Sequence, residues 1–452
     1  MKYPYKKYLY IPEPLKNLLK AKLTSSKQRR TFFLHLIYSI LDGIILGVLA
    51  LNEFVLIKGL DGSDYQTALL FQFTTVILLF SIVLNQVLKR TKRKKRFLKI
   101  VAVVTRLPLL LLLIFPDNIS EVHNPFIYQA LFLFIFLIYY SANPVIFPVI
   151  NLLLKTNYKN KNFSKFYSWA TAANKVVMLI VTFFTGIILD YSPSSYTKIY
   201  PLLAILGITS IFILMKIDYS GVNIVIPKKS LKEDISNSLK KMLAILKSNK
   251  PFRDFEIGFM LYGFAWLATI AVIAIFLDKA LHLSYTGIAF YKNVYTGISI
   301  ILTPIFGKLL GSIDPRKFAV YNFSALLLYL FFMGLTEYVS ASITIGGITI
   351  YWTLLASYIS YGFFAAMMAL LWYIGSAYFC RDNEAADYQS IHLSITGFRA
   401  LFAPLFGIFF LKLVGYTGVF LIGIGSLSIG IALMFWSMRH RKLIDIIKKT
   451  SD

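Results

Sequence analysis

The segment from residue 64 to residue 124 reads DYQTALLFQFTTVILLFSIVLNQVL (64–88), KRTKRKKR (89–96), FLKIVAVVTRLPLLLLLIF (97–115) and PDNISEVHN (116–124). Two long apolar stretches are separated by a strongly basic loop, and a loop with acidic residues follows them. About 20 apolar residues are enough to cross a bilayer as a helix, and positively charged loops stay in the cytoplasm. The segment therefore predicts two membrane-spanning helices joined on the cytoplasmic side.

The same alternation continues through the 452-residue chain and predicts an all-α polytopic membrane protein. Every second loop is basic. Of the 47 lysines and arginines, four lie inside the apolar stretches and four in the intervening loops, and all the others lie in the basic loops and the chain ends. This asymmetry predicts that both chain ends lie in the cytoplasm. We expect about twelve spans, near Thr31–Lys58, Asp64–Leu88, Phe97–Phe115, Pro125–Leu154, Tyr167–Asp190, Tyr196–Met215, Phe255–Leu277, Tyr285–Leu309, Phe318–Leu335, Ile348–Phe379, Gln389–Leu413 and Gly418–Met438.

Composition argues against a soluble protein and gives the positive charge a membrane role. The chain is 57% hydrophobic and 15% charged, with a mean hydropathy of +0.67 and a net charge of +26, far from the soluble average. The basic runs flank the spans and are separated by them, and the sequence has no zinc-ligand spacing or RNA-binding signature. We therefore expect contact with anionic lipid head groups and not with nucleic acid. The single cysteine, Cys380, cannot form an internal disulfide, and we expect no metal ion and no cofactor.

A polar loop divides the chain into two similar halves. We expect a basic cytoplasmic arm at 1–30 without a cleavable signal peptide, a six-helix half at 31–216, a cytoplasmic loop at 217–252, a second six-helix half at 253–438 and a cytoplasmic tail at 439–452. The halves resemble weak copies: Leu41-Asp42-Gly43 recurs as Leu261-Tyr262-Gly263, and Gln72 corresponds to Lys292. Two such repeats in parallel register are typical of transporters, with the substrate site at their interface near the midplane.

The loop after the eighth span carries a family pattern. It reads Gly307-Lys308-Leu309-Leu310-Gly311-Ser312-Ile313-Asp314-Pro315-Arg316-Lys317. Its glycine, leucine and final Arg-Lys resemble the Gly-x-Leu-Ala-Asp-Arg-x-Gly-Arg-Arg-Lys signature of the major facilitator superfamily. With the six-plus-six spans, the resemblance covers nearly the whole chain. The segment Asp387-Tyr388-Gln389-Ser390-Ile391-His392 through Arg399 and Pro404 resembles bacterial members with uncharacterised substrates. The resemblance implies that family's fold and gating roles for Gly307, Asp314, Arg316 and Lys317.

The chain also departs from the pattern of that family. Gly311 stands where the signature has its acidic residue, and the first copy, Asn85 to Lys95, has no carboxylate. These differences put in doubt the carboxylate contact that usually stabilises one gate. The glycine-rich span-five motif of drug/proton antiporters is replaced by Thr182-Phe183-Phe184-Thr185-Gly186-Ile187, which argues against drug export by that subfamily.

Charged residues inside the spans are the first candidates for function, because ionisable groups in a membrane are costly. Asp42 lies about halfway along the first span, where a carboxyl group can exchange a proton; the alternative is an ion pair with Arg106 or Lys175. Arg399 and Lys292 lie in helices that line the cavity in the resembled family and could hold an anion. Their alternative is pairing with a carboxylate or a main-chain carbonyl. Lys175 could bind substrate or extend toward the cytoplasm.

Near the middle of the spans, positive side chains outnumber negative ones: Arg106, Lys175, Lys292 and Arg399 stand against Asp42. This excess of positive charge motivates a small anionic substrate, and other side chains could complete its pocket. Asn143, Tyr262 and Asn293 offer aromatic and amide groups, with lipid contact or helix packing as the alternative. Structural or gating roles are expected for Arg106 and Glu256.

The function that fits best is a secondary active transporter of the cytoplasmic (inner) membrane, working by alternating access as a monomer, with proton-coupled symport as one option. An ATP-driven pump would need a phosphate-binding loop, and no Gly-x-x-x-x-Gly-Lys-Ser/Thr run is present. The alternatives are a transporter-like receptor or lipid-handling protein without transport and, less favoured, a membrane-embedded transferase. The five histidines are scattered, and clustered acid/base groups that a transferase needs are not evident, so we expect no enzyme.

Overall fold

The computed structural model describes residues 26–80, 90–91, 93–158, 160–218, 231–380 and 384–441. The expected arm up to residue 25, most of the first copy of the signature, the centre of the middle loop and the end of the tail lie outside the described residues. Within the described part, helices dominate, and ten helical stretches are long and apolar enough to cross a membrane.

The first half is built from helices that follow the expected spans. Its elements are α2 (Ser26–Leu49), which continues through α3 (Asn52–Phe54) and the π-helical turn η1 (Val55–Gly59), α4 (Asp64–Val76) with η2 (Ile77–Phe80), α6 (Lys94–Arg106) with η3 (Leu107–Ile114), η4 (Ile119–Glu121), α7 (Pro125–Tyr140), α8 (Asn143–Asn157), α9 (Asn160–Tyr191), η5 (Pro193–Ser195) and α10 (Tyr196–Leu214). Two of the breaks follow from proline. Pro108 accompanies the change from α6 to the 3-10 helix η3, and Pro144 sits in the first turn of α8, because proline cannot donate the main-chain hydrogen bond.

The second half repeats this plan. Its elements are α11 (Leu231–Ser248), α12 (Lys250–Ile275) with the π-helical turn η6 (Phe276–Ala280), α13 (Tyr285–Leu310), α14 (Pro315–Leu335), β1 (Ser342–Ile345), β2 (Ile348–Tyr351), α15 (Trp352–Ile374) with η7 (Gly375–Phe379), α16 (Ala385–Ala400) and α17 (Ala403–His440). Gly415 has a φ of 70° and interrupts α17, so the stretch Tyr388–His440 crosses the membrane twice. Together with α4 and η2, these helices account for about twelve spans, which confirms the predicted fold class.

The boundaries of two segments differ from the expectation. The tenth span was expected to begin at Ile348, but Ile348–Tyr351 pairs antiparallel with Ser342–Ile345, and the helix begins at Trp352. Gly346 and Gly347 have φ values of 56° and 78°, the left-handed conformation that a two-residue hairpin turn requires. In the expected middle loop, Leu231–Ser248 forms helix α11, and α12 begins at Lys250.

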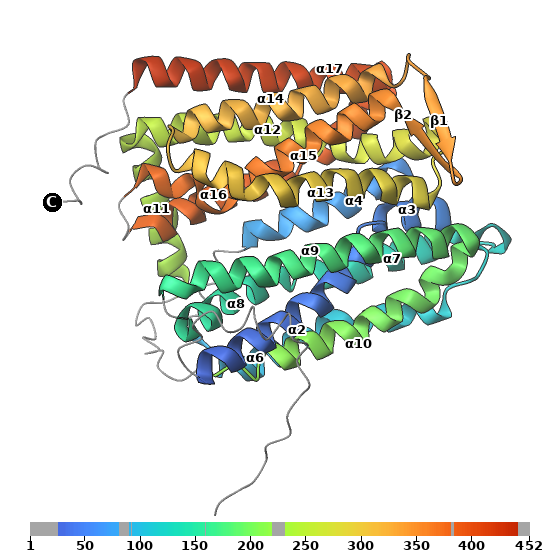
Figure 1. Ribbon diagram of the computed structural model, residues 1–452, viewed down its shortest axis with the longest axis horizontal. Helices are drawn as coiled ribbons and strands as arrows, with labels where there is room; N and C mark the ends of the chain where they lie inside the picture. Colours follow the sequence, from blue (N-terminus) through green and yellow to red (C-terminus); the bar gives the residue numbers. More distant parts are fainter. Residues whose placement is uncertain are drawn as a thin grey trace, which may run out of the picture.

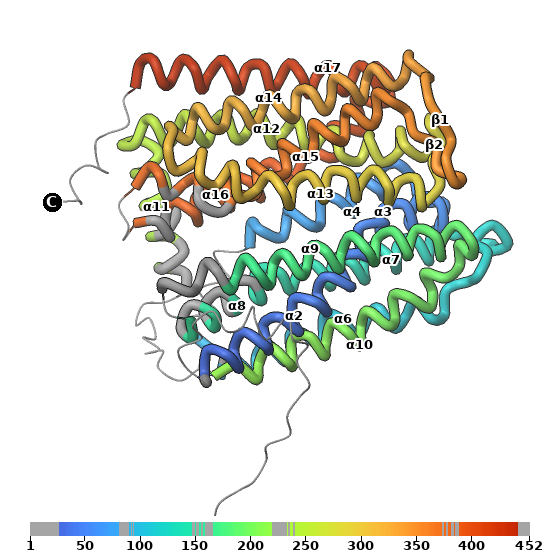
Figure 2. Tube along the Cα trace, in the orientation of Figure 1, coloured from blue at the N-terminus to red at the C-terminus, as the bar shows by residue number. Residues whose placement is uncertain are grey.

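The two halves lie one above the other, with the helix axes close to the long axis of the molecule (Figure 1). The tube in Figure 2 shows that the blue-to-green first half lies below the yellow-to-red second half. Helix α4 belongs to the first half but packs against α12, α16 and α17 of the second. The interface between the halves is therefore formed by helices from both repeats.

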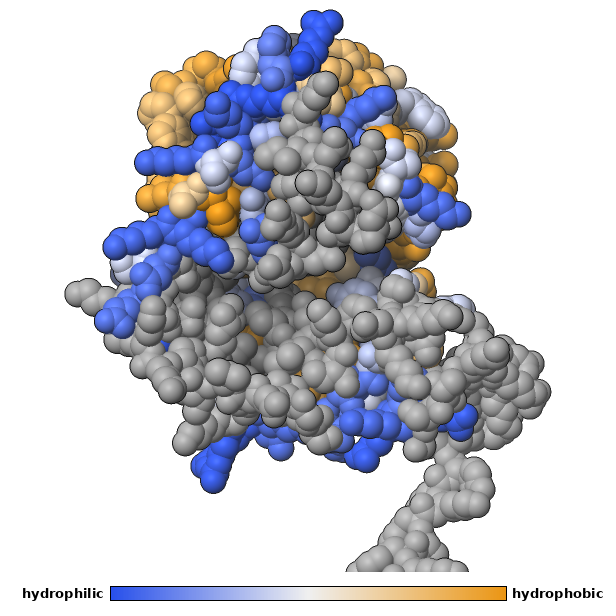
Figure 3. Space-filling model, turned by 90° about the vertical axis from the view of Figure 1, so that its left-hand side faces the viewer, coloured by the Kyte–Doolittle hydropathy of each residue, from blue (hydrophilic) through white to orange (hydrophobic). Residues whose placement is uncertain are grey.

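The two ends of the bundle differ in charge. We call the end at which the described chain begins and finishes the basic end; hydrophilic side chains gather there (Figure 3), and it carries Arg93, Arg316 and Arg441. The opposite end, with the β-hairpin, is called the acidic end. Its loops and helix ends carry Asp61, Asp64, Asp117, Glu121, Asp190, Asp278 and Glu337.

Candidate functional site

Two ion pairs join the halves at the acidic end. The Nζ of Lys58 in η1 lies 2.8 Å from a carboxylate oxygen of Asp278 and donates to the main-chain oxygen of Leu283 at 2.7 Å. The Nζ of Lys279 lies 2.8 Å from a carboxylate oxygen of Asp64. In each pair one half supplies the lysine and the other half supplies the carboxylate, so these contacts hold the halves together at this end.

Asp190 adds a third contact between the halves at the acidic end. It lies near the end of α9, and its carboxylate accepts hydrogen bonds from the main-chain nitrogens of Tyr285 at 2.7 Å and Thr286 at 2.8 Å. These nitrogens belong to the first turn of α13, where an anion is favoured. A Cβ on Gly186 would lie 3.1 Å from the Cα of Thr286, so α9 and α13 approach closely here.

A buried ion pair lies deeper between the halves. Lys292 of α13 forms an ion pair with Glu53 of α3 and donates to the main-chain oxygen of Ala50 at 2.5 Å. Only 18% of the Lys292 side chain and 11% of the Glu53 side chain are exposed. Lys292 was a candidate for binding an anion, and in this structure a carboxylate of the other half occupies it. Its neighbour Asn293 donates to the main-chain oxygen of Leu179 at 3.0 Å and also bridges the halves.

Lys175 lies on the face of α9 that meets α13. Asp190, Gly186 and Leu179 of α9 all contact α13, and Lys175 is one turn further toward the basic end on the same stripe. Its side chain is half-buried. It makes no hydrogen bond or ion pair with another described residue. On α13, a Cβ added to Gly297 would have no atom within 4 Å, so there is space beside α13 one turn beyond Asn293.

Asp42 contacts α9 through Asn174, the residue that precedes Lys175 in the sequence. Gly43 lets α2 approach α9, since a Cβ there would lie 2.6 Å from the main-chain oxygen of Asn174. The Nδ2 of Asn174 donates to a carboxylate oxygen of Asp42 at 3.1 Å and to the main-chain oxygen of Ser39 at 2.9 Å. Asp42 is half-buried, and no cation among the described residues forms an ion pair with it. Asp42 is thus held by the neighbour of Lys175 in α9, not by Lys175 itself.

Arg399 is buried inside the second half. It is 1% exposed and donates to the main-chain oxygen of Phe259. Its guanidinium carbon lies 5.2 Å from the ring centroid of Tyr262, and Tyr262 stacks on Phe323 with 5.3 Å between centroids. Gly263 leaves the space that the guanidinium fills. Arg399 therefore contacts α12 and, among the described residues, shares no hydrogen-bond or ion-pair partner with Lys292 or Lys175.

Two further buried groups make contacts within one half. His392 Nδ1 lies 3.1 Å and 3.2 Å from the carboxylate oxygens of Glu256. Arg106 donates to the Thr105 hydroxyl at 2.5 Å, and its guanidinium carbon lies 4.8 Å from the Tyr139 ring centroid. The expected structural or gating roles of Glu256 and Arg106 stay predictions; the structure shows their contacts inside one half.

The signature residues form a charge network at the basic end. The Asp314 carboxylate pairs with Arg316 at 2.8 Å, and Arg316 also donates to the main-chain oxygens of Ser437 and Arg441 at 3.1 Å and 2.8 Å. Asp254 accepts from the Ser437 hydroxyl at 2.8 Å and pairs with Arg441 at 2.5 Å. The network ties α12, α14 and α17 together within the second half. Lys317 is exposed, and a Cβ on Gly307 would meet no atom within 4 Å.

An aromatic cluster in the second half surrounds Trp266, which the sequence offers as a pocket candidate, and includes three tyrosines that the sequence did not single out: Tyr295, Tyr329 and Tyr361. The Nε1 of Trp266 donates to the hydroxyl of Tyr361 at 3.3 Å. The Tyr361 ring lies 4.8 Å from Tyr295 and 4.6 Å from Tyr329 between centroids. Trp266 and Tyr361 are half-buried, and Trp266 packs in a small apolar cluster that includes Val76 of the first half. The spacing of tyrosines along α13 and α15 was the available signal.

The remaining candidates are Asn143 and any group of side chains that could bind a metal ion. Asn143 begins α8, is half-buried and makes no hydrogen bond with another described residue. Within the described ranges, no three His, Cys, Asp or Glu side chains gather in a way that could hold a metal ion.

Comparisons with known proteins place this geometry in a family. A family model described as Major Facilitator Superfamily matches residues 31–379. No curated protein matches the chain. Among solved structures, the chain is similar to the nucleoside transporter NupG, with a TM-score of 0.68, 15% identity and coverage of 91% of this chain and 100% of that chain. It is also similar to a POT family transporter in complex with a thioalcohol-conjugated peptide, with a TM-score of 0.65, 12% identity and coverage of 91% and 97%. For a D-xylose-proton symporter, the TM-score is 0.60, the sequence identity is 15%, and the similarity covers 90% of this chain and 96% of that chain.

Proposed function

Because the chain belongs to the major facilitator superfamily, we propose that it is a secondary active transporter that moves a small anionic solute across the cytoplasmic membrane by alternating access, coupled to protons. The basic end lies in the cytoplasm in this proposal, since positive loops are retained there. The observation that carries the substrate class is Lys175, a cation at the inter-half face of α9 that no described carboxylate neutralises.

Alternating access is supported by where the halves are joined. The pairs Lys58–Asp278 and Lys279–Asp64 and the contact of Asp190 with α13 all lie at the acidic end. Each one can break and re-form as a unit when one half rocks against the other, because each has its two partners in different halves. This arrangement closes the acidic end while the solute would be exchanged at the basic end.

Proton coupling is assigned to Asp42 in this proposal. Its partner Asn174 is neutral, whereas Glu53 is held by Lys292. A carboxyl group inside the membrane without a bound cation is the better carrier of a proton, because protonation removes a costly charge. Asp42 accepts a hydrogen bond from Asn174, which is next to Lys175 in α9, and this link would allow an anion and a proton to influence each other.

Lys175→Gln is expected to weaken anion binding about ten-fold or more, since a charge-assisted hydrogen bond is worth about 1.5–3 kcal/mol. The probes are phosphorylated and carboxylate metabolites, with neutral sugars for comparison, added to purified protein during thermal unfolding. A ligand that binds the folded state raises the melting temperature. Lys175→Arg, which keeps the charge, should retain most of the shift. Anion shifts that survive Lys175→Gln, or shifts with neutral sugars alone, would overturn the anionic substrate.

A cross-link at the acidic end is expected to abolish transport. In a Cys380→Ser background, Asp190→Cys with Thr286→Cys joins α9 to α13 at the point where the Asp190 side chain already reaches the Thr286 main-chain nitrogen. The control, Leu261→Cys with Gly430→Cys, lies within the second half, where the two Cβ positions are 3.6 Å apart. Uptake of the best solute of the thermal screen into liposomes should stop on oxidation of the first pair, return on reduction, and continue with the control pair.

The alternative functions have their own outcomes in the same experiment. Uptake that continues with the acidic end cross-linked would contradict alternating access. A solute that binds but is never taken up by the unmodified protein would favour a transporter-like receptor. Neither outcome depends on which residue binds the solute.

A further inference from the structure

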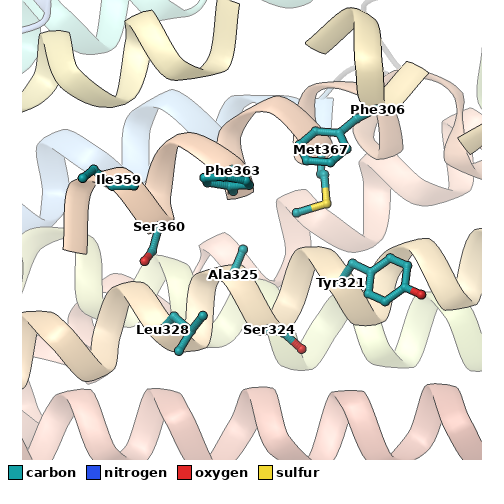
Figure 4. Close-up of a pocket in the computed structure, with 9 residues that line it drawn as sticks. All are labelled: Phe306, Tyr321, Ser324, Ala325, Leu328, Ile359, Ser360, Phe363 and Met367. Carbon is teal, nitrogen blue, oxygen red and sulfur yellow. The ribbon is translucent and has the colours of Figure 1, made fainter. Parts of the chain in front are cut away.

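The outer surface of the second half carries a groove that the transport proposal does not use. It has a volume of about 440 Å³ and lies between α14 and α15, with Phe306 of α13 at one end. Figure 4 shows Met367 and Phe306 together at that end, and Ala325 and Ser360 facing each other further along. Ala325 and Met367 are 8% and 4% exposed, so they form the floor.

The groove faces the lipid. Tyr321, Leu328 and Phe363 on its rim are 42%, 46% and 41% exposed, and all three belong to membrane-spanning helices. The Ser360 hydroxyl is already satisfied by donating to the main-chain oxygen of Ala356 at 2.9 Å. An apolar groove at this depth is filled from the bilayer, so its occupant is a hydrocarbon chain.

The groove has the length and position of a chain in one leaflet. Seven residues of helix separate Tyr321 from Leu328, which corresponds to about 10 Å along the axis of α14. The first residue of α14, Pro315, lies about 9 Å beyond Tyr321 toward the basic end. A leaflet contributes about 15 Å of hydrocarbon. The groove therefore runs from near the membrane surface at the basic end toward the midplane.

A cation stands at the surface end of the groove. Lys317 precedes Tyr321 by one turn on the same face of α14, is exposed, and makes no hydrogen bond or ion pair with another described residue. Its neighbour Arg316 is engaged by Asp314 and Ser437. Lys308, in the last turn of α13, is also exposed at this end. We propose that the groove holds one acyl chain of an anionic phospholipid whose head group is bound by Lys317.

The test is lipid binding by the full-length protein in detergent, measured by native mass spectrometry. The probes are phosphatidylglycerol and phosphatidylcholine with the same acyl chains, at equal concentration. A lysine near a membrane surface favours an anionic lipid by about five-fold, so wild type should prefer phosphatidylglycerol by that factor. Lys317→Gln should reduce the preference toward one. Lys317→Arg should keep it, as should Lys216→Gln, which removes an exposed lysine of the first half.

A second variant tests the groove itself. Ala325→Phe places a ring over the floor and should lower the binding of both phospholipids at this site while Lys317 is intact. Soluble glycerol phosphate, which has the charge but no chains, should not bind measurably. Equal binding of the two phospholipids by wild type, or a preference unchanged by Lys317→Gln, would overturn the proposal. Glycerol phosphate binding that depends on Lys317 and not on Ala325 would assign Lys317 to a soluble phosphate instead.

Discussion

Glu53→Gln is expected to destabilise the protein by about 3–5 kcal/mol, because removing one partner of a buried ion pair leaves the other charge uncompensated. The pair of Glu53 with Lys292 lies between the halves, and its side chains are 11% and 18% exposed. The glutamine would leave the Lys292 ammonium without its negative partner, beside the Ala50 carbonyl and the face of the Phe54 ring. The double variant Glu53→Gln/Lys292→Gln should recover at least half of the loss, since no buried charge is then left over.

The measurement is chemical denaturation in detergent micelles followed by tryptophan fluorescence. The matched control is a cross-half pair at the acidic end, Asp64 with Lys279, in which the lysine side chain is 49% exposed. Water screens that pair, so Asp64→Asn should cost less than about 1 kcal/mol. If Glu53→Gln and Asp64→Asn cost the same, or if the double variant is no better than Glu53→Gln alone, the inter-half pair does not have the role that its burial indicates.

The Glu53–Lys292 pair also shows which part of the architecture could be predicted from the sequence. Spans and the alternation of loop charge depend on composition along the chain, so about twelve spans, two halves and the family were predictable. Lys292 stands out in the sequence as a charge inside an apolar stretch, but its partner Glu53 is on the other half of the chain. Glu53 lies close to a loop in the sequence, a position that favours exposure to water, yet only 8% of the residue is exposed in the structure.

Whether an individual charge is buried depends on how the helices pack against one another, and the pattern of neighbouring residues in the sequence does not indicate this packing. Asp42 and Lys175 lie on helices whose faces could be assigned only once α9 was seen to contact both α2 and α13. The hairpin between α14 and α15 was hidden for a different reason. Its strand Ile348–Tyr351 is apolar and runs directly into the helix that begins at Trp352, so hydropathy alone merges the two, although the Gly346-Gly347 pair is a hairpin signal.

Gly263→Ala is expected to destabilise the second half because the added methyl would occupy the position of the Arg399 guanidinium. Overpacking a well-packed interior costs about 1–3 kcal/mol, and Arg399 is 1% exposed and has no solvent to move into. Gly425→Ala is the control in a neighbouring membrane helix, since a Cβ there meets no atom within 4 Å. It should leave the melting temperature unchanged or raise it slightly, because alanine favours the helix.

The decisive comparison is the double variant Gly263→Ala/Arg399→Ala. Arg399→Ala alone leaves a cavity and removes a buried side chain from the Phe259 carbonyl, with an expected loss of about 2–5 kcal/mol by analogy with other large-to-small changes in cores. In that background the methyl group added at position 263 enters empty space, so Gly263→Ala should cost nothing further. The two changes would then be strongly non-additive, as expected for residues in contact. Additive losses, measured by the same denaturation, would show that Arg399 does not fill the space above Gly263. If Arg399 has a structural role and Lys175 binds the anion, the two variants should differ. Anion-induced shifts in melting temperature should persist in Arg399→Ala protein that remains folded and disappear in Lys175→Gln.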